Sequence, residues 1–173
     1  MNKLKMLFWS LIIFISTFEL DRITKQYALD HFDGPGYIPQ KVNQFLSFEL
    51  VLNRGVTGGM FHTQDNFWFF VLSIFVACIA LLLGIYAYRR WRQESIIFGE
   101  ALALSGAFSN LIDRVLYGGV IDFIVLSYKQ WYFPVFNIAD ACIVLGVVIV
   151  FFVHVHEPFD RSSGRTQDDA EKN

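Results

Sequence analysis

Four long apolar segments constrain the fold of this 173-residue chain more than any other feature. A bilayer core of about 30 Å requires roughly 20 helical residues, with a lower limit near 17. The segments that meet this requirement are about 4–20, 67–88, 96–112 and 133–153. With 54% hydrophobic and 17% charged residues, the chain is also more apolar than an average soluble domain of its size. We therefore predict an all-α membrane protein with four transmembrane helices.

The distribution of Lys and Arg predicts the orientation of these helices. Lys3 and Lys5 lie at the start of the first segment, and Arg89, Arg90 and Arg92 crowd the short connection between the second and third segments. Because basic residues near spanning helices are retained in the cytoplasm, we expect both termini to be cytoplasmic. Residues 21–66 and 113–132 then face outward. No small-x-small cleavage site follows the first segment, so we interpret it as a retained helix rather than a signal peptide.

The outward segment 21–66 is too long to be a simple connector. Its part 45–52 is rich in aromatic and aliphatic residues, and turn signals with Gly and Pro lie on either side. We expect a small β-rich segment here that lies on the outer (periplasmic) membrane surface. The tail 158–173 is polar and charged, and we expect it to be a disordered cytoplasmic extension of one transmembrane domain over 1–157.

Composition and motifs exclude several functions. A formal net charge of -2 provides no basic surface for nucleic acid. Cys78 and Cys142 lie in apolar runs, so we expect no disulfide. His154 and His156 would point to different faces of a helix, and no His-Glu-x-x-His or Gly-x-Ser-Gly motif occurs. We therefore expect no metal site, and we disfavour zinc and serine peptidase mechanisms.

One carboxylate, Asp140, lies inside the fourth apolar segment. An ionisable residue within a membrane-spanning segment costs several kcal/mol on insertion scales and indicates a functional site by default. Asn137 precedes Asp140 by three residues and shares its helix face. Asn110, Asp113 and Arg114 share a face in the same way at the end of the third segment. The polar residues therefore gather on particular helix faces.

These polar residues all fall at the outward ends of the expected helices, although the topology was derived from basic residues alone. Asp21 and Lys25 follow the first segment, and Asp122 follows two glycines in a stretch that can return towards the bundle as an extended strand. If Asp122 and Asp140 meet in a low dielectric, both cannot ionise easily and they would share a proton. One would then act as base on a water and the other as acid, which is the chemistry of aspartic peptidases.

Structural roles are alternatives for each of these residues. A helix-end ion pair that fixes packing explains Asp113 with Arg114 as well as a catalytic role does. Asp21 and Lys25 are charges at a helix end, which commonly mark the membrane interface. Hydrogen bonds between helices could hold Asp140 in place, and a scaffold of that kind is one alternative function.

A small proton- or ion-coupled transporter is the alternative from another class, with Asp140 and Glu100 as relay carboxylates. A conduit needs polar residues in both halves of the membrane. The second segment has no ionisable residue and the polar residues cluster on one side. We therefore disfavour transport, and we interpret Glu100 as a cytoplasmic-side residue without a chemical role.

Five blocks together resemble the lipoprotein signal peptidases, the bacterial type II signal peptidases that are integral-membrane aspartic proteases. In order, the blocks are Asp21-Arg22-Ile23-Thr24-Lys25, Asn53-Arg54-Gly55-Val56-Thr57-Gly58-Gly59-Met60-Phe61, Ser109-Asn110-Leu111-Ile112-Asp113-Arg114, Gly118-Gly119-Val120-Ile121-Asp122-Phe123 and Phe136-Asn137-Ile138-Ala139-Asp140. Two departures affect local packing and the fit of the outer loop: Ser109 stands where the family usually has Gly, and the stretch 56–60 differs from the commoner Ala-Phe-Gly type.

The resemblance implies a bacterial inner-membrane endopeptidase that cleaves a prolipoprotein before a cysteine already carrying diacylglycerol. It implies Asp122 and Asp140 as the catalytic pair, with no cofactor and with lipid-modified prolipoproteins and membrane lipid as partners. It further implies residues that shape the site or hold substrate backbone, and residues that support them. The first group is Asn53, Gly55, Asn110, Arg114, Asn137 and Ala139, and the second is Asp21, Lys25 and Asp113. One chain carries a complete site, so we expect a monomer.

Overall fold

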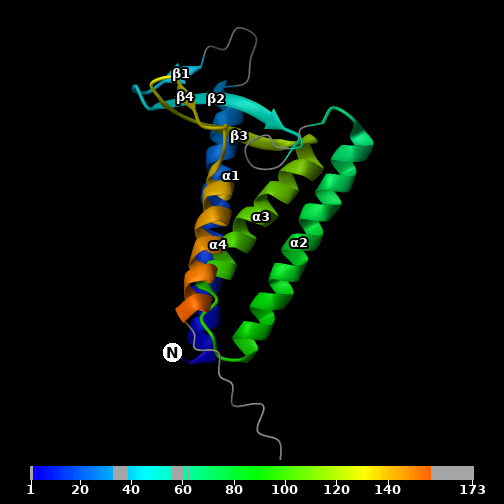
Figure 1. The fold of residues 1–173 in the computed structure, drawn as a ribbon, viewed down its shortest axis with the longest axis vertical. Helices are drawn as coiled ribbons and strands as arrows, with labels where there is room; N and C mark the ends of the chain where they lie inside the picture. The colour runs from blue at the N-terminus through cyan, green and yellow to red at the C-terminus, as the bar shows by residue number, and fades with distance from the viewer. Residues whose placement is uncertain (1, 33–38, 56–60, 62, 157–173) are drawn as a thin grey trace, which may run out of the picture.

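The computed structural model describes residues 2–32, 39–55, 61 and 63–156. Within these residues, four helices form an elongated bundle with a small sheet at one end (Figure 1). The helices are α1 (Lys3–Phe32), α2 (Asn66–Arg92), α3 (Phe98–Tyr117) and α4 (Ile138–His156). The strands are β1 (Gln40–Lys41), β2 (Leu46–Asn53), β3 (Val120–Tyr128) and β4 (Trp131–Tyr132), and they form an antiparallel sheet in the order β1-β2-β3-β4. The predicted helix-rich fold with a small β segment is confirmed.

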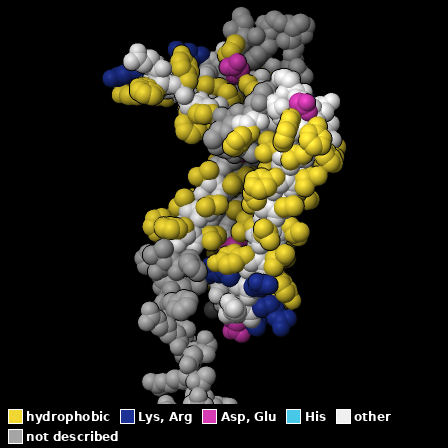
Figure 2. Space-filling view, turned by 45° about the vertical axis from the view of Figure 1, so that its right-hand side comes forward, with side chains coloured by type: hydrophobic (Ala, Val, Ile, Leu, Met, Phe, Trp, Pro, Cys, Tyr) yellow, Lys and Arg dark blue, Asp and Glu magenta, His cyan; other side chains and the backbone are white. Residues whose placement is uncertain are grey.

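The helix α2 is the strongest candidate for a membrane crossing. Asp65 caps its first turn, since the carboxylate accepts hydrogen bonds from the N–H groups of Phe67 at 2.7 Å and Trp68 at 3.2 Å. An 18-residue window of α2 has a mean hydropathy of 2.8, and among the described helices α2 alone is long and apolar enough to cross by length and composition. Hydrophobic side chains cover its exposed surface, and basic side chains gather at the end away from the sheet (Figure 2). The stretch Ile138–Val153 of α4 is apolar but shorter, so four crossings stay a prediction.

The helix α1 continues well beyond the expected span 4–20 and ends at Phe32. Asp21 and Lys25 do not end the helix, because both are buried in contact with α3 and form an ion pair there. The outward segment therefore begins with about three further turns of helix. The expected turn at 34–36, the stretch 56–60 and the tail 158–173 lie outside the described residues, as do the side chains of the two histidines near the end of α4.

The helix α3 lies centrally and packs on α1, α2 and α4 (Figure 1). Small residues make its contact with α4 very close. A Cβ atom on Gly106 would overlap the carbonyl oxygen of Ala139, and a Cβ atom on Gly146 would lie 2.6 Å from the amide nitrogen of Ala103. These small residues therefore permit the two helix backbones to approach closely.

The strand β3 returns across the sheet end of the bundle, as the glycine-containing stretch predicts. Gly118 ends α3 in the left-handed conformation with φ of 69°, which reverses the chain into β3. β3 pairs with β2, where Val51 lies opposite Asp122, and Ile124 exchanges backbone hydrogen bonds with Phe136 ahead of α4. β3 therefore connects the ends of α3, β2 and α4.

Glu100 is buried in the bundle, whereas the sequence suggested only a cytoplasmic-side residue. Its side chain lies 3.4 Å from the Arg90 guanidinium, and both residues are at most 4% exposed. They lie near the end of the bundle away from the sheet. Because the partner comes from α2, sequence spacing within one helix gave no indication of it.

Candidate active site

The residues singled out in the sequence meet where α1, α3 and α4 adjoin β2 and β3. Asp122 is the third residue of β3 and is 1% exposed, while Asp140 lies in the first turn of α4 and is 4% exposed. The other expected residues in this region are also buried: Asn53, Gly55, Asn110, Arg114, Asn137, Ala139, Asp21, Lys25 and Asp113. The cluster is thus a single buried site assembled from distant parts of the chain.

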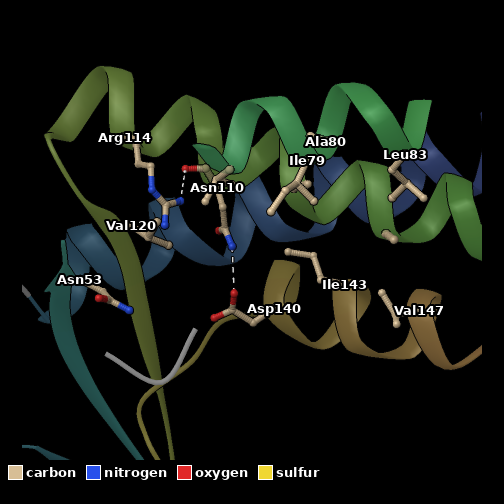
Figure 3. A pocket seen from close by; sticks show the side chains of 13 residues that line it. Asn53, Ile79, Ala80, Leu83, Asn110, Arg114, Val120, Asp140, Ile143 and Val147 are labelled. Carbon is tan, nitrogen blue, oxygen red and sulfur yellow. Dashed lines mark hydrogen bonds between the residues drawn. The ribbon is translucent and has the colours of Figure 1, made fainter. Parts of the chain in front are cut away.

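Side-chain amides hold both carboxylates. Asp122 accepts hydrogen bonds from Asn53 at 2.9 Å on one oxygen and from Asn137 at 2.6 Å on the other. Asn110 donates to Asp140 at 2.9 Å (Figure 3). Each amide is oriented by another contact: Asn53 accepts the N–H of Gly55 at 2.8 Å, and Asn137 accepts the N–H of Asp140 at 2.8 Å. Asn137 thereby also caps the start of α4.

The electrostatic environment of Asp122 favours a bound proton. Burial, and secondarily the negative charge of Asp140, raise the pKa of Asp122 from 3.8 to about 7. Hydrogen bonds from Asn53 and Asn137 and the positive charge of Lys25 oppose this rise. A pKa near 7 suits a group that gains and loses a proton during a reaction at neutral pH.

A second layer of charges supports the carboxylates. Lys25 is fully buried and lies 2.7 Å from a carboxylate oxygen of Asp21 and 2.7 Å from one of Asp113. Asp113 also pairs with Arg22 and accepts the N–H of Ile121 at 3.3 Å. These contacts join α1, α3 and β3. Asp113, which shares a helix face with Arg114, therefore forms its ion pairs with Arg22 and Lys25 of α1.

Asp21 links α1 to the other two helices. One of its oxygens accepts the N–H of Ala139 at 2.7 Å, and the other accepts the Ser109 hydroxyl at 2.6 Å. Ser109, which the sequence marked only as a departure from the family pattern, therefore supplies a hydrogen bond that Gly lacks. Sequence reasoning also missed Arg22, although it lies inside the first motif block; its spacing from its partner on α3 carries no signal.

Arg114 fixes the outer segment above the carboxylates. Its guanidinium donates to the carbonyl of Gly55 at 2.7 Å and to the carbonyl of Asn110 at 3.1 Å. Gly55 is thus a backbone contact point. Beyond it, Arg54 donates to the side chain of Asn66 at 2.7 Å and lies 4.7 Å above the ring of Phe69, which ties the segment to α2.

A cavity of about 210 Å³ opens beside Asp140. Its polar end contains Asn53, Asn110, Arg114 and Asp140 (Figure 3). Its other walls are apolar side chains of α2, α3 and α4 with Val120 of β3: Val76, Ile79, Ala80, Leu83, Ala103, Ala107, Ile143 and Val147. The polar site therefore continues into an apolar slot between helices. In the part of the chain that the structure describes, no group of three or more His, Cys, Asp or Glu side chains is arranged to hold a metal ion.

A helix bundle with an apolar surface and a buried carboxylate site defines a membrane-embedded enzyme of the aspartic type. The family model described as signal peptidase (SPase) II matches residues 13–156. The chain therefore belongs to the signal peptidase II family and is an aspartic peptidase of that type. Membership in a peptidase family decides against the transporter interpretation.

Curated relatives and solved structures agree with this assignment. The chain is 35% identical over 142 residues to the lipoprotein signal peptidase of Clostridium novyi, with 80% of this chain and 92% of the relative covered. It is 33% identical over 156 residues to that of Polynucleobacter necessarius, with 88% and 93% covered. A solved bacterial membrane enzyme superposes with a TM-score of 0.68 at 24% identity, covering 92% of this chain and 93% of that one. A second solved bacterial membrane enzyme superposes with a TM-score of 0.65 at 25% identity, and together with the family membership it indicates a membrane protein.

Proposed function

We propose that the protein removes signal peptides from prolipoproteins by cleaving before a cysteine that already carries diacylglycerol, with Asp122 and Asp140 as the catalytic pair. The observation that carries the proposal is the burial of two carboxylates, from β3 and α4, that are held by asparagine amides, with Asp140 at the end of an apolar slot. The names of the relatives supply the class of substrate.

The reaction follows from two carboxyl groups that share one proton. The ionised carboxylate takes a proton from a water, whose oxygen attacks the carbonyl carbon of the scissile peptide bond. The protonated carboxyl group donates its proton to the carbonyl oxygen. Collapse of the resulting tetrahedral intermediate breaks the C–N bond and transfers a proton to the departing amine. Each turnover consumes one water and returns the pair to one shared proton.

The apolar slot explains why a lipid-modified substrate suits this site. Its walls are aliphatic side chains from three helices, and the substrate's hydrocarbon chains already lie in the bilayer. Entry from the bilayer buries apolar surface while the scissile bond reaches the polar end of the slot. Arg114 and Asn53 border that end, and the carbonyl of Gly55 accepts a hydrogen bond from Arg114. In the proposed mechanism these residues shape the opening and hold substrate backbone.

The proposed topology is four crossings of the bacterial inner membrane with both termini in the cytoplasm. The basic side chains at the end of the bundle away from the sheet support it, because positive residues are retained inside. The active site and the sheet then lie near the periplasmic face. The chain contributes the whole carboxylate cluster, so we propose that the monomer is active.

The test compares two matched precursor peptides incubated with the purified full chain in detergent micelles, one with a diacylglyceryl cysteine and one with an unmodified cysteine. Mass spectrometry identifies the products. The proposal predicts cleavage of the modified peptide alone, with the lipidated cysteine as the new N-terminus. Equal cleavage of both peptides, or cleavage at another bond, would contradict it.

A further inference from the structure

The charged groups around the carboxylate pair include one more carboxylate than cations. Four carboxylates lie in the cluster: Asp21 on α1, Asp113 on α3, Asp122 on β3 and Asp140 on α4. Three cations face them: Arg22 and Lys25 on α1 and Arg114 on α3. The Cys142 thiol of α4 also lies within electrostatic range of Asp21 and is neutral when protonated. A single bound proton therefore brings the cluster to neutrality, which is the state that a low dielectric favours.

Lys25 is the cation that joins the two halves of this cluster. Its ammonium group is fully buried and its three contacts are the carboxylates of Asp21 and Asp113 and the side-chain oxygen of Asn110, at 2.8 Å. An ammonium group has only donors, so it turns the oxygen of Asn110 towards itself and leaves the amide N–H groups for Asp140. Asn137 adds a longer contact of 3.2 Å to the same Asn110 oxygen.

We propose that Lys25 is a positioning residue that holds the Asp122 and Asp140 pair at one shared proton near neutral pH, by orienting Asn110 and by supplying one of the three cations that face the carboxylates. The proposal rests on the proposed catalytic roles of the two aspartates. It extends them, because it assigns the protonation state of the pair to a residue on a different helix that does not contact either aspartate.

The direction of the effect follows from electrostatics. The charge of Lys25 lowers the pKa of Asp122, against the larger increases from burial and from Asp140. Removal of that charge leaves four carboxylates facing two cations, so neutrality requires a second proton. The pair then holds two protons at neutral pH and lacks the ionised carboxylate that must accept a proton from water. Activity returns only as the pH is raised.

A purely structural role for Lys25 predicts something else. Loss of one partner of a buried ion pair leaves an uncompensated charge and destabilises the fold. In that case the amount of folded protein decreases, but the pH profile of the remaining folded enzyme stays as in the wild type. The pH dependence of cleavage by folded protein therefore separates the two roles.

The experiment compares Lys25→Met, Asp21→Asn and the double variant. Asp21→Asn keeps an oxygen that can accept the N–H of Ala139, but its NH2 group then lies where the carboxylate oxygen contacts the Ser109 hydroxyl and the Lys25 ammonium. The double variant removes the ammonium and with it this contact between two donors. The rate of cleavage of the lipid-modified peptide is measured from about pH 4 to about pH 10 in steps of about one pH unit. The rate is divided by the amount of folded protein, which size-exclusion chromatography measures. Asp65→Asn, at the α2 cap outside the cluster, is the control.

We expect the acidic limb of kcat to move up by about one pH unit or more in Lys25→Met. Asp21→Asn removes a negative charge, so its alkaline limb moves down, and the double variant returns both limbs towards the wild type. A wild-type profile in folded Lys25→Met overturns the proposal. If Lys25→Met does not fold, the proposal fails when Asp21→Asn keeps the wild-type alkaline limb. If the wild-type chain does not cleave the lipid-modified peptide at any pH, the proposed function itself is refuted.

Discussion

Replacement of Gly106 by Ala tests how the packing of α3 on α4 positions the reactive groups. A Cβ atom at this position overlaps the carbonyl oxygen of Ala139 and lies 2.9 Å from a side-chain carbon of Ile143. The obstructing atom is backbone, so a side-chain rotation cannot relieve the overlap. The two helices must separate by roughly 1 Å to restore ordinary contact, and such overpacking typically costs about 1–3 kcal/mol.

The separation acts directly on the site. Gly106 lies one turn before Asn110 on the same face of α3, and Ala139 directly precedes Asp140. The hydrogen bond between Asn110 and Asp140 is 2.9 Å long, so a displacement of roughly 1 Å takes it beyond hydrogen-bonding range. A misplacement of that size can cost about 10²-fold in rate, and we expect a loss of that order in kcat.

The assay measures cleavage of the lipid-modified peptide under single-turnover conditions, together with thermal unfolding in the same detergent. Gly84→Ala on α2 is the matched control, because a Cβ atom there meets nothing within 4 Å. It should leave both the rate and the unfolding temperature close to wild type. Wild-type cleavage by folded Gly106→Ala would refute the link between helix packing and catalysis.

Three further outcomes are expected. Glu100→Ala breaks a buried ion pair and should lower the free energy of unfolding by about 3–5 kcal/mol without altering the cleavage rate of folded protein. Arg90→Met combined with Glu100→Leu should recover most of the lost stability. Chemical denaturation measures the stability, and single-turnover cleavage measures the rate. Asn53→Ala removes a hydrogen bond that lowers the pKa of Asp122, so the acidic limb of its kcat profile should move up, and an unchanged limb would contradict this. The pKa of Asp122 is raised from 3.8 to about 7. The stability gained from its neutral form is therefore complete below about pH 4 and is lost as the pH rises to about 7. The unfolding temperature should decrease over this window, and a constant unfolding temperature would contradict the raised pKa.

The sequence predicted the features that depend on local patterns. Apolar segments long enough to be helices, small residues at the α3 and α4 contact, and two glycines before a returning strand all leave a signal within a short window of sequence. The juxtaposition of Asp122 with Asp140 was also predictable, because one connection links α3, β3 and α4 in order along the chain. The resemblance to a family then fixed the class of enzyme, which the family model confirms.

Contacts between distant helices were not predictable in the same way. The charges at Asp21 and Lys25 suggested the end of a helix at the membrane surface, yet α1 continues through both residues, which pair with each other while Lys25 also pairs with Asp113 on α3. Arg90 and Glu100 form a buried pair for the same reason. A charged residue shows its cost in the sequence, whereas the partner that offsets this cost becomes visible only when the helices are packed.

The central claim is that Asp122 and Asp140 together activate water, and the most direct test is the single-turnover rate of Asp122→Asn and Asp140→Asn on the lipid-modified peptide. Asp65→Asn is the control, since Asn caps a helix about as well as Asp and the residue lies outside the cluster. We predict that Asp122→Asn and Asp140→Asn each lose at least about 10³-fold in rate, while the control cleaves normally. Thermal unfolding and chromatography establish that each variant is folded. Cleavage at the wild-type rate by a folded Asp122→Asn or Asp140→Asn variant would contradict the claim.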